Sequence, residues 1–415
     1  MTYEQATEYI DSFLIFGSKL GLERVTKLLN DLGNPQDKLK FIHVAGTNGK
    51  GSVCAYCSSI LQQAGYKTGL FTSPYIIDFR ERFQINGEMI SEDELCSIVE
   101  KIKSIVDTYP DDEIPTEFEI VTAIGMMYFY QNNCDVVVLE VGLGGRFDST
   151  NVIKNPMVSV ICSISLDHTA QLGDTVDKIA FEKAGIIKEN CESVLYPVQE
   201  EEVFKVIEDV AIKKHSNLTI AKNERISIVD RHINGDIIRF NDLDIALKIP
   251  GMFQPLNFIT AVTAIEKSGL KVTDSQIKNG AEKAFFPARL QLFSENPKIL
   301  LDGAHNPDGV KALKEHLEKY FDKPTAIIGM MKDKDVSTVL SEIAPLFSKI
   351  ITVTVNNPRS LTADELAEKA EKYCDNVMPI ADYKKAILQE RKANEDFVIC
   401  GSFYLCSDAL KILED

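Results

Sequence analysis

The stretch that decides the fold is Gly46-Thr47-Asn48-Gly49-Lys50-Gly51-Ser52. It follows an apolar run at residues 41–45 and precedes a segment of helical character at residues 53–64. In a glycine-rich turn between a strand and a helix, backbone N–H groups converge and the helix N-terminus adds partial positive charge, while a lysine can meet the outer phosphates. The stretch therefore predicts a loop that cradles the phosphates of a nucleotide.

This loop differs from the P-loop template G-x4-G-K-[ST] at two points. Only Thr47 and Asn48 separate the first two glycines, and Gly51 stands between the lysine and Ser52. The order of strand, glycines, lysine, hydroxyl and helix is retained, so we interpret the loop as nucleotide-binding. The alternative is a glycine-rich turn beside a surface lysine.

Length and charge bound the class of protein. A chain of 415 residues is too long for one ordinary core, so we expect two domains. The net charge of −17 disfavours a broad surface for nucleic acid or anionic membrane, because such surfaces need clustered cations. An anionic small molecule could still bind in a local basic pocket.

Targeting signals are missing from the sequence. The N-terminal stretch 1–5 is polar and acidic, without the basic start and apolar segment of a signal peptide, and no apolar run reaches about 18 residues. The nine cysteines are scattered, and the pair Cys54 and Cys57 has no partner ligands. We therefore expect free thiols rather than disulfides or a redox pair, and a cytoplasmic protein.

The N-terminal region alternates short β-rich runs with helical patterns. Such alternation predicts a mostly parallel sheet with helices on both faces, and ligands then gather at the carboxyl ends of the strands. The phosphate loop and Glu140 both fall at such ends. The predicted strands are residues 40–45, 67–71, 135–141 and 157–164, and the predicted helices are 53–64, 92–108, 118–132 and 176–187.

Two further regions follow. Residues 217–249 alternate apolar and polar side chains around Asn234-Gly235, which predicts a small antiparallel region, and a helix is expected at 257–268. After a break at 285–289, strands and helices alternate again to the end of the chain. The expected fold class is α/β: a P-loop-type, mostly parallel sheet domain with a small antiparallel region at 1–288, and a smaller Rossmann-like α/β domain at 289–415.

Several polar side chains fall at predicted strand ends in the first domain. Hydroxyl, carboxylate and phosphate oxygens suit Mg²⁺, whereas imidazole is a less usual ligand. Each residue also has a structural alternative, such as a paired carboxylate, a helix cap or a turn residue, but their grouping beside a phosphate loop favours function. The residues are Lys50 with Ser52, Ser73, Glu140, His168 and Lys183.

Two other turns could carry chemistry. The glycine-rich turn at 142–148 lets the backbone and Arg146 approach a carboxylate or phosphate, although it could be a plain strand exit. The segment from Asp302 to Pro307 places an acid, His305 and an asparagine after a strand, where they could orient a ribose or a reacting amine. The alternative is an ordinary helix start, with Asn306 as the cap and Pro307 at the first helical position.

These segments together resemble the folylpolyglutamate synthase/dihydrofolate synthase family of the Mur ligase superfamily. The resemblance implies a two-domain, ATP-dependent amide ligase with its site in the cleft between the domains. A folate or dihydropteroate carboxylate would be phosphorylated by ATP, and the amine of L-glutamate would attack the acyl phosphate. The resembling segments are residues 20–24, 32–36, 43–52, 72–74, 81–82, 140–146 and 301–307.

The resemblance also implies roles by position. The ATP contacts would be Gly46, Thr47, Asn48, Gly49, Lys50, Gly51, Ser52, Asn257, Arg289 and Asp302. The Mg²⁺ ligands would be Ser52, Ser73, Glu140, His168 and Lys183, and the catalytic residues Lys50, Lys183 and His305. The acceptor would lie along Arg80, Arg82, Thr116, Phe118 and Arg146.

Lys183 matches the lysine that this superfamily carries as a carbamate. An ammonium about 5 Å from Mg²⁺ would be repelled by roughly 6–7 kcal/mol at an effective dielectric constant near 20. That repulsion would depress the pKa of the lysine, and a neutral amine can capture CO₂ to become an anionic oxygen ligand. The alternative is an ordinary surface lysine of a helix.

Two departures from the family pattern stand out. The family usually has a histidine before the glutamine at Gln254, where this chain has Phe253, so a nucleotide contact is in doubt there. The usual Pro-Gly-Arg is here Pro287-Ala288-Arg289, so the turn before the arginine can differ.

Two rival functions remain open from the sequence. A Mur-type ligase could instead act on a cell-wall nucleotide precursor, and a nucleotide-dependent regulatory switch could use the same loop. Against the switch, the chain has no Asn-Lys-x-Asp segment for guanine. We expect small-molecule partners only, with no nucleic acid and no membrane, and a monomer.

Overall fold

A computed structural model describes residues 1–17 and 19–414, with the backbone alone for Pro307 and Asp308. The chain divides into two units. Unit 1 comprises Met1–Tyr75, Phe79–Arg225 and Leu256–Ala284. Unit 2 comprises Ile76–Asp78, Ile226–Pro255 and the chain from Phe285 onward.

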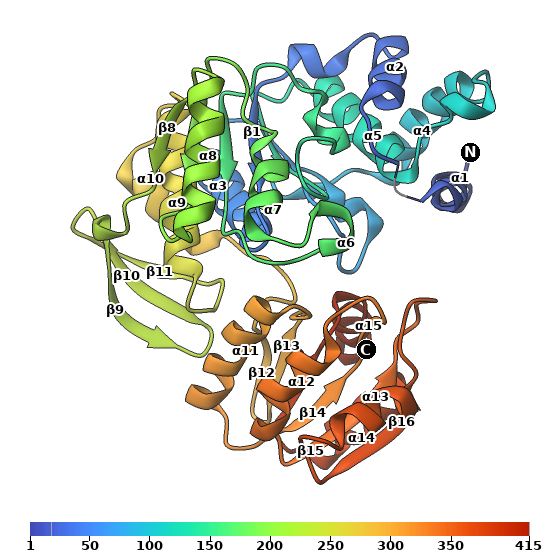
Figure 1. Ribbon diagram of the computed structural model, residues 1–415, viewed down its shortest axis with the longest axis vertical. Helices are drawn as coiled ribbons and strands as arrows, with labels where there is room; N and C mark the ends of the chain where they lie inside the picture. Colours follow the sequence, from blue (N-terminus) through green and yellow to red (C-terminus); the bar gives the residue numbers. More distant parts are fainter. Residues whose placement is uncertain (18, 415) are drawn as a thin grey trace. The chain divides into compact units, whose positions relative to one another are not determined.

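The centre of unit 1 is a mixed, mostly parallel sheet that contains eight strands among the described residues (Figure 1). Its order is β4-β3-β2-β5-β1-β6-β7-β8, and only β3 and β4 run antiparallel to their neighbours. The strands β1 and β5 are buried along their whole length, as expected for central parallel strands. The bounds are β1 (Phe41–Ala45), β2 (Thr68–Phe71), β3 (Phe83–Ile85), β4 (Glu88–Met89), β5 (Val136–Glu140), β6 (Val158–Ile161), β7 (Glu192–Leu195) and β8 (Asn217–Ile220).

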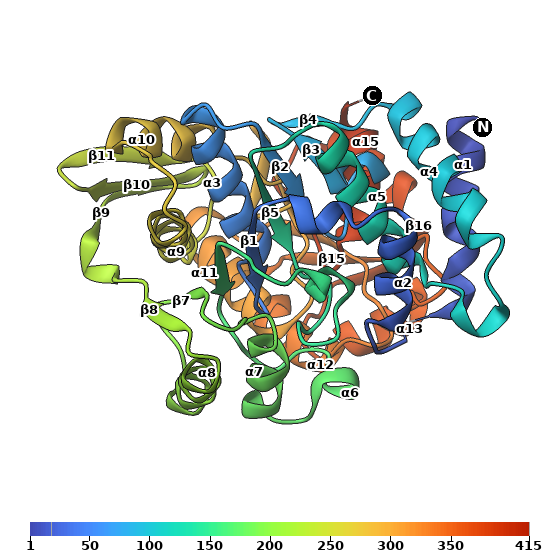
Figure 2. The same ribbon diagram turned by 90° about the horizontal axis from the view of Figure 1, so that it is seen from above.

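Helices cover this sheet with separate apolar clusters. One cluster joins α1, α2, α4 and α5 to strand residues such as Phe71 and Leu139. Another joins α7 and α8 to Ala45, Ile161 and Leu195, and Figure 2 shows these two helix groups apart from each other. The helix bounds are α1 (Tyr3–Asp11), α2 (Glu23–Asp31), α3 (Lys50–Gln63), α4 (Glu92–Val106), α5 (Glu117–Gln131), α6 (Thr169–Leu172), α7 (Val176–Ala184), α8 (Glu201–Lys213), α9 (Gln254–Lys267) and α10 (Asp274–Lys283).

The predicted α/β alternation is confirmed, with corrections at element ends. Helix α3 begins at Lys50 rather than at residue 53, because Gly49 at φ 85° turns the chain directly into the helix. Residues 217–220 were predicted to belong to the antiparallel region, and this is wrong. They form β8, which pairs parallel with β7 at the edge of the large sheet.

Unit 2 contains the antiparallel sheet and the second α/β layer. The three strands β9 (Ile226–His232), β10 (Gly235–Phe240) and β11 (Leu243–Leu247) pair antiparallel, which confirms the hairpin predicted at Asn234-Gly235. A sheet of six described strands has the order β12-β13-β17-β14-β15-β16, and only β12 is antiparallel. The strands are β12 (Gln291–Glu295), β13 (Lys298–Asp302), β14 (Thr325–Ile328), β15 (Lys349–Thr354), β16 (Val377–Asp382) and β17 (Phe397–Cys400).

Two apolar clusters cover opposite sides of this second sheet. One includes Val310, Leu340 and Leu366 from three helices, and the other includes Ile387 and Leu410 from the last two helices. The helices are α11 (Pro307–Tyr320), α12 (Val336–Ile343), α13 (Ala363–Ala370), α14 (Tyr383–Ala393) and α15 (Phe403–Glu414).

All nine cysteines are free thiols, as expected from their scatter. Cys54 and Cys57 are buried in α3, where burial raises the pKa of both thiols. Across the described ranges, no helix combines the length and the apolar character needed to cross a membrane.

Candidate active site

The predicted phosphate loop connects β1 to α3 in unit 1. Its backbone is fixed to the segment after β6, since the N–H groups of Thr47 and Asn48 both donate to the Ser163 carbonyl, at 2.7 and 3.3 Å. The Thr47 hydroxyl donates to the Ser165 carbonyl at 3.1 Å. No described side chain caps the N-terminus of α3. The first N–H groups of the helix therefore point toward the loop, where an anion can accept hydrogen bonds from them.

Two lysines converge on one carbonyl of this loop. Lys50 Nζ donates to the Gly46 carbonyl at 3.1 Å, and Lys183 Nζ donates to the same oxygen at 2.9 Å. Lys183 is buried in the last turn of α7. Burial, and next the charge of Lys50, lower the pKa of Lys183 to about 7. Lys50 also donates to the Thr47 carbonyl at 3.3 Å, so the loop brings two basic groups together where an anion can bind.

Glu140 ends β5, the strand between β1 and β2. Its carboxylate is buried and accepts a hydrogen bond from the backbone N–H of Ser73 at 3.1 Å. The pKa of the Cys162 thiol is raised chiefly by burial and is also influenced by the charges of Lys50, Glu140 and Lys183. Lys50, Glu140 and Lys183 therefore all lie near enough to Cys162 for their charges to affect its pKa.

Asn257 and Ser52 also lie at the loop. A Cβ on Gly49 would come within 2.5 Å of Asn257 Oδ1, so α9 places this amide directly against the loop. Gly49 is required both by its φ of 85° and by this close approach. Ser52 is buried in the first turn of α3. The structure thus brings both residues to the predicted phosphate cradle.

The residues fit a nucleotide-bound Mg²⁺ better than a metal held by protein alone. Among the described side chains, no three His, Cys, Asp or Glu residues are placed to hold a metal ion. Mg²⁺ usually takes one or two carboxylates and completes its shell with waters and phosphate oxygens. Buried Glu140 with the hydroxyls of Ser52 and Ser73 matches that donor set. His168 differs, since its side chain is 42% exposed and lies 3.9 Å from Asp167.

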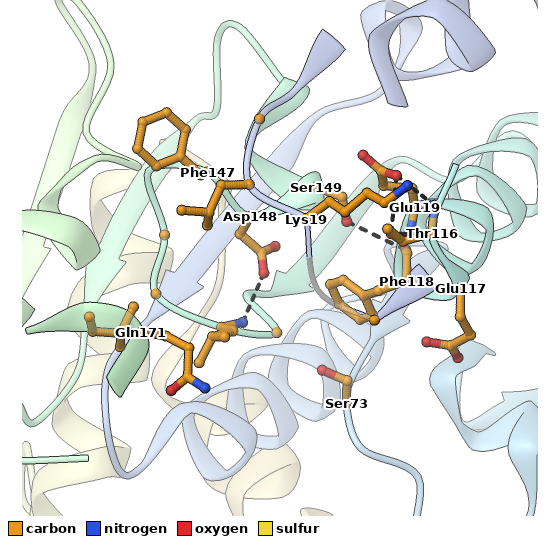
Figure 3. A pocket seen from close by; sticks show the side chains of 18 of the residues that line it. Lys19, Ser73, Thr116, Glu117, Phe118, Glu119, Phe147, Asp148, Ser149 and Gln171 are labelled. Carbon is orange, nitrogen blue, oxygen red and sulfur yellow. Dashed lines mark hydrogen bonds between the residues drawn. The ribbon is translucent and has the colours of Figure 1, made fainter. Parts of the chain in front are cut away.

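A cavity of about 940 Å³ lies within unit 1 beside this site. Figure 3 shows Ser73, Thr116, Phe118, Asp148 and Gln171 around it. Its wall includes the turn at 142–145, which packs on α7, where a Cβ on Gly145 would come within 2.8 Å of the Glu182 and Lys183 carbonyls. The cavity is therefore continuous in structure with the residues that surround the phosphate loop.

Three of the five predicted acceptor residues line this cavity. Arg82 is buried, its guanidinium lies 5.1 Å from the centre of the Tyr75 ring, and its Nε has no hydrogen-bond partner among the described residues. Thr116 caps α5 and Phe118 packs on Gly142, where a Cβ would come within 2.4 Å of the ring. These side chains offer a cationic group and an aromatic face to a ligand.

Arg80 and Arg146 are not among the described residues that line the cavity. Arg80 contacts Glu92 at 3.6 Å. Arg146 lies with its guanidinium about 5 Å from the centres of the Phe147 and Phe181 rings, and its side chain is 48% exposed. The roles of these two arginines as acceptor contacts therefore stay predictions.

Asp148 was not predicted as a site residue, although the glycine-rich turn at 142–148 that contains it was. The carboxylate is buried, lines the cavity and accepts hydrogen bonds from Leu143 N at 2.8 Å and from Thr150 Oγ1 at 2.5 Å. Burial raises its pKa, and those hydrogen bonds oppose the rise. Asp148 was hard to single out because an Asp after a glycine-rich turn is common in plain loops.

In unit 2, the predicted residues meet at the end of β13. Asp302 is buried and accepts hydrogen bonds from Leu290 N and Ala304 N, both at 2.8 Å. Burial raises the pKa of Asp302, and the charge of Arg289 opposes the rise. His305 Nδ1 lies 2.8 Å from the Gly303 carbonyl. Ala288, which replaces the family glycine, has φ 54°, a conformation that glycine adopts at lower cost.

Family models match both units of this architecture. The model of the Mur ligase middle domain matches residues 44–265, and the model of the Mur ligase glutamate ligase domain matches residues 288–403. The phosphate loop, the sheet around it and the C-terminal α/β layer thus define a ligase of the Mur superfamily.

Relatives of similar length narrow the class further. The dihydrofolate synthase/folylpolyglutamate synthase of Bacillus subtilis is 36% identical over 435 residues, which cover 99% of each chain. A solved folylpolyglutamate synthase of Thermotoga maritima is 33% identical, with a TM-score of 0.88 over 99% of this chain and 96% of that one. E. coli FolC, solved in complex with DHPP and ADP, is 31% identical, with a TM-score of 0.86 over 99% and 97%.

The chain belongs to the folylpolyglutamate synthase/dihydrofolate synthase family, and it is an ATP-dependent glutamate ligase. The similarity over nearly the whole length decides against both rivals considered from the sequence, the cell-wall precursor ligase and the regulatory switch.

Proposed function

We propose that this ligase joins L-glutamate to the carboxylate of a pteroate-type acceptor, either dihydropteroate or a folate, bound in the 940 Å³ cavity. The observation that carries this proposal is the contact between the cavity wall and Glu140, which ends the strand beside β1. Ser73 lines the cavity while its N–H donates to Glu140, and Gly142 lines it two residues after Glu140. An acceptor in the cavity would thus have its reactive end near the nucleotide phosphates.

The composition of the cavity wall supports a flat, partly polar acceptor. Its volume falls within the usual range of about 300–1,000 Å³ for small-molecule sites. Phe118 offers an aromatic face, while Arg82, Asp148 and Gln171 offer polar groups for the edge of a ring or for a carboxylate. Arg80 and Arg146 were predicted acceptor contacts, and we restrict the proposal to Arg82, Thr116 and Phe118.

The chemistry follows from the poor reactivity of a carboxylate. One carboxylate oxygen attacks the γ-phosphorus of ATP, ADP leaves, and the resulting acyl phosphate has a good leaving group. The glutamate amine then attacks the acyl carbon, loses a proton and expels inorganic phosphate. Two anions approach each other in the first step, so Lys50 lowers the barrier by neutralising developing charge.

We propose that Ser52, Ser73 and Glu140 would hold the magnesium ion of Mg-ATP, and that His168 and Lys183 would contribute to the same site. When bound, Mg²⁺ supplies positive charge that offsets the charge of the phosphates. For the nucleotide itself, we propose contacts from residues 46–52 and from Asn257, Arg289 and Asp302. His305 would help to position the transferred phosphoryl group.

We also propose that Lys183 carries a carbamate in the active enzyme. Burial and the charge of Lys50 lower the pKa of Lys183 to about 7, so a large fraction of the amine is neutral at neutral pH. The neutral nitrogen would bond to the carbon of CO₂, and one proton would leave to solvent. Two measurements test this step. Activity should fall when CO₂ is removed and return when bicarbonate is restored, and ¹³C-bicarbonate should give a carbamate signal in the NMR spectrum.

Three points stay predictions from the sequence. They are the assignment of ATP binding to residues 1–288 and of the glutamate ligase domain to 289–415, the cytoplasmic location and the monomeric state. A phosphate-release assay tests the function itself. It compares dihydropteroate with a reduced folate monoglutamate, each with and without L-glutamate. We expect release that depends on acceptor and glutamate together, and the active acceptor defines the substrate. Release that ignores both acceptors would contradict the proposal.

A further inference from the structure

Phe403 has no role in the proposed function so far, yet it lies among the residues of unit 2 that carry it. It is the first residue of α15 and follows the carboxyl end of β17. Strand β17 pairs parallel with β13, with Cys400 opposite Asp302. The topology therefore brings Phe403 next to the turn that begins at Asp302.

The ring of Phe403 contacts three elements of that site. A Cβ on Gly303 would come within 2.3 Å of two ring carbons, so the ring occupies the space of a side chain at that position. The His305 ring meets it edge-on, at 5.7 Å between centroids and 73° between planes. The Arg289 guanidinium lies 4.6 Å from the ring centroid, within the distance of a cation–π interaction.

The backbone around Arg289 is already fixed by other contacts. Leu290 N donates to Asp302 and Gly303 N donates to the Ala288 carbonyl at 3.0 Å. Those bonds hold the main chain, whereas the arginine side chain interacts with the charge of Asp302 and with aromatic rings. A second ring, that of Phe286, lies farther from the guanidinium, at 5.7 Å. Phe403 therefore lies nearer to the guanidinium than Phe286 does, and it also packs on His305.

We propose that Phe403 is a positioning residue, whose ring holds the Arg289 guanidinium and the His305 imidazole in one arrangement for the nucleotide. The proposal rests on the proposed role of Arg289 as an ATP contact. An arginine side chain loses rotamer entropy when it is ordered on a nucleotide, and the contact with the ring restricts that side chain beforehand and so removes part of the cost.

The test measures the Kd of a non-hydrolysable ATP analogue with Mg²⁺ by calorimetry, which does not depend on turnover. Phe403→Leu keeps an apolar side chain but removes the aromatic face, so we expect a Kd about 3- to 10-fold higher, as a cation–π contact predicts. Phe403→Tyr keeps the face and should stay within about 2-fold of the wild type. In an Arg289→Ala background, Phe403→Leu should have a clearly smaller effect, because only the contact of the ring with His305 is then left to lose.

Phe321 provides a matched control. It is another partly buried phenylalanine of unit 2 and lies 5.2 Å from Lys298 Nζ, in a cation–π contact away from Arg289. Phe321→Leu should leave the Kd unchanged. Gly303→Ala provides a second route, since the new Cβ would displace the Phe403 ring, and we expect the same rise in Kd.

The inference is overturned if folded Phe403→Leu and Gly303→Ala proteins bind the analogue as tightly as the wild type, or if the Phe403 and Arg289 effects add fully. Its failure differs from failure of the proposed function, which would appear as wild-type protein that binds the analogue but shows no glutamate-dependent phosphate release.

Discussion

Each of the two units has a turn at the carboxyl end of a parallel strand, directly before a helix. The two turns differ in how their polar groups are hydrogen-bonded. In unit 1, no described side chain caps α3, and two lysines point at one carbonyl of the loop. In unit 2, Asn306 caps α11 by accepting from Gly309 N at 2.9 Å, and Asp302 is satisfied by two backbone N–H groups. The first turn is prepared for an anion, whereas the second is internally satisfied and fixes its neighbours.

Glycine also serves different purposes in the two turns. Gly49 has φ 85° and approaches Asn257, so both its conformation and its lack of a side chain matter. Gly303 has no such positive φ and is needed only because the Phe403 ring occupies the space of a Cβ. A glycine at a strand end therefore marks either a special backbone or a close neighbour, and only the structure separates these cases.

Among the changes that test this difference between the two turns, removal of Lys50 from the first turn should have the largest effect on activity. We expect Lys50→Met to lower kcat by about 100- to 1,000-fold, the usual loss for one group that stabilises transition-state charge. Steady-state kinetics with saturating ATP measure it. Lys154→Met, at a side chain that is 71% exposed, is the control and should keep full activity. A Lys50 variant with kcat within 3-fold of the wild type, about 0.6 kcal/mol, would contradict the catalytic role of Lys50.

Strain at Gly49 should have the next largest effect. In Gly49→Ala, the methyl group would clash with Asn257 Oδ1 and the residue would keep a left-handed φ. We expect ATP-analogue affinity to fall about 10- to 100-fold, since distortion of the cradle misplaces several N–H donors together. Calorimetry measures this. Gly65→Ala, a positive-φ glycine with open space around it, serves as the control for backbone strain alone. Equal affinities in the two variants would refute the role of the loop.

The buried lysine should appear in the pH dependence of stability. The pKa of Lys183 falls from 10.5 to about 7 on folding, so between these values the unfolded chain binds more protons. The free energy of unfolding of the wild type, relative to Lys183→Met, should therefore rise by about 1.4 kcal/mol per pH unit from pH 7 to 10.5. Urea unfolding in CO₂-free buffer measures the difference. A difference that stays constant with pH would show that the folded-state pKa is not lowered.

The capped turn should give the smallest effect. Asn306→Ala removes the acceptor for Gly309 N, so we expect a loss of about 1 kcal/mol in the free energy of unfolding. Asn306→Asp keeps a side-chain acceptor at the cap and should restore most of that stability. Denaturant titration compares the three proteins. If both variants lose the same stability, the cap does not explain the role of Asn306.

Much of the fold could be predicted because central parallel strands are continuous apolar runs. The strands β1 and β5 are buried throughout and were found within one residue. The edge strand β16 was missed, since most of it is exposed and it contains Pro379. The edge strand β8 was assigned to the wrong sheet. A half-exposed parallel edge alternates apolar and polar residues as an antiparallel strand does.

The candidate site divides in the same way. The phosphate loop, Glu140 and Ser73 could be located from strand ends, because each follows a strong apolar run. Arg82 and Arg80 could not be told apart from the sequence, although only Arg82 is buried against the cavity. Arg146 is not among the described residues that line the cavity, so its role as an acceptor contact stays a prediction.

By itself, the sequence determined the α/β alternation, the phosphate loop and the family, since these depend on local patterns: apolar runs, glycines and the order of residues in short segments. Only the tertiary structure decided which groups share an environment. The low pKa of Lys183, the burial of Arg82 and the contact of Phe403 with Arg289 all join distant segments of the chain. Burial and electrostatic interaction act through space, so no local pattern in the sequence can specify them.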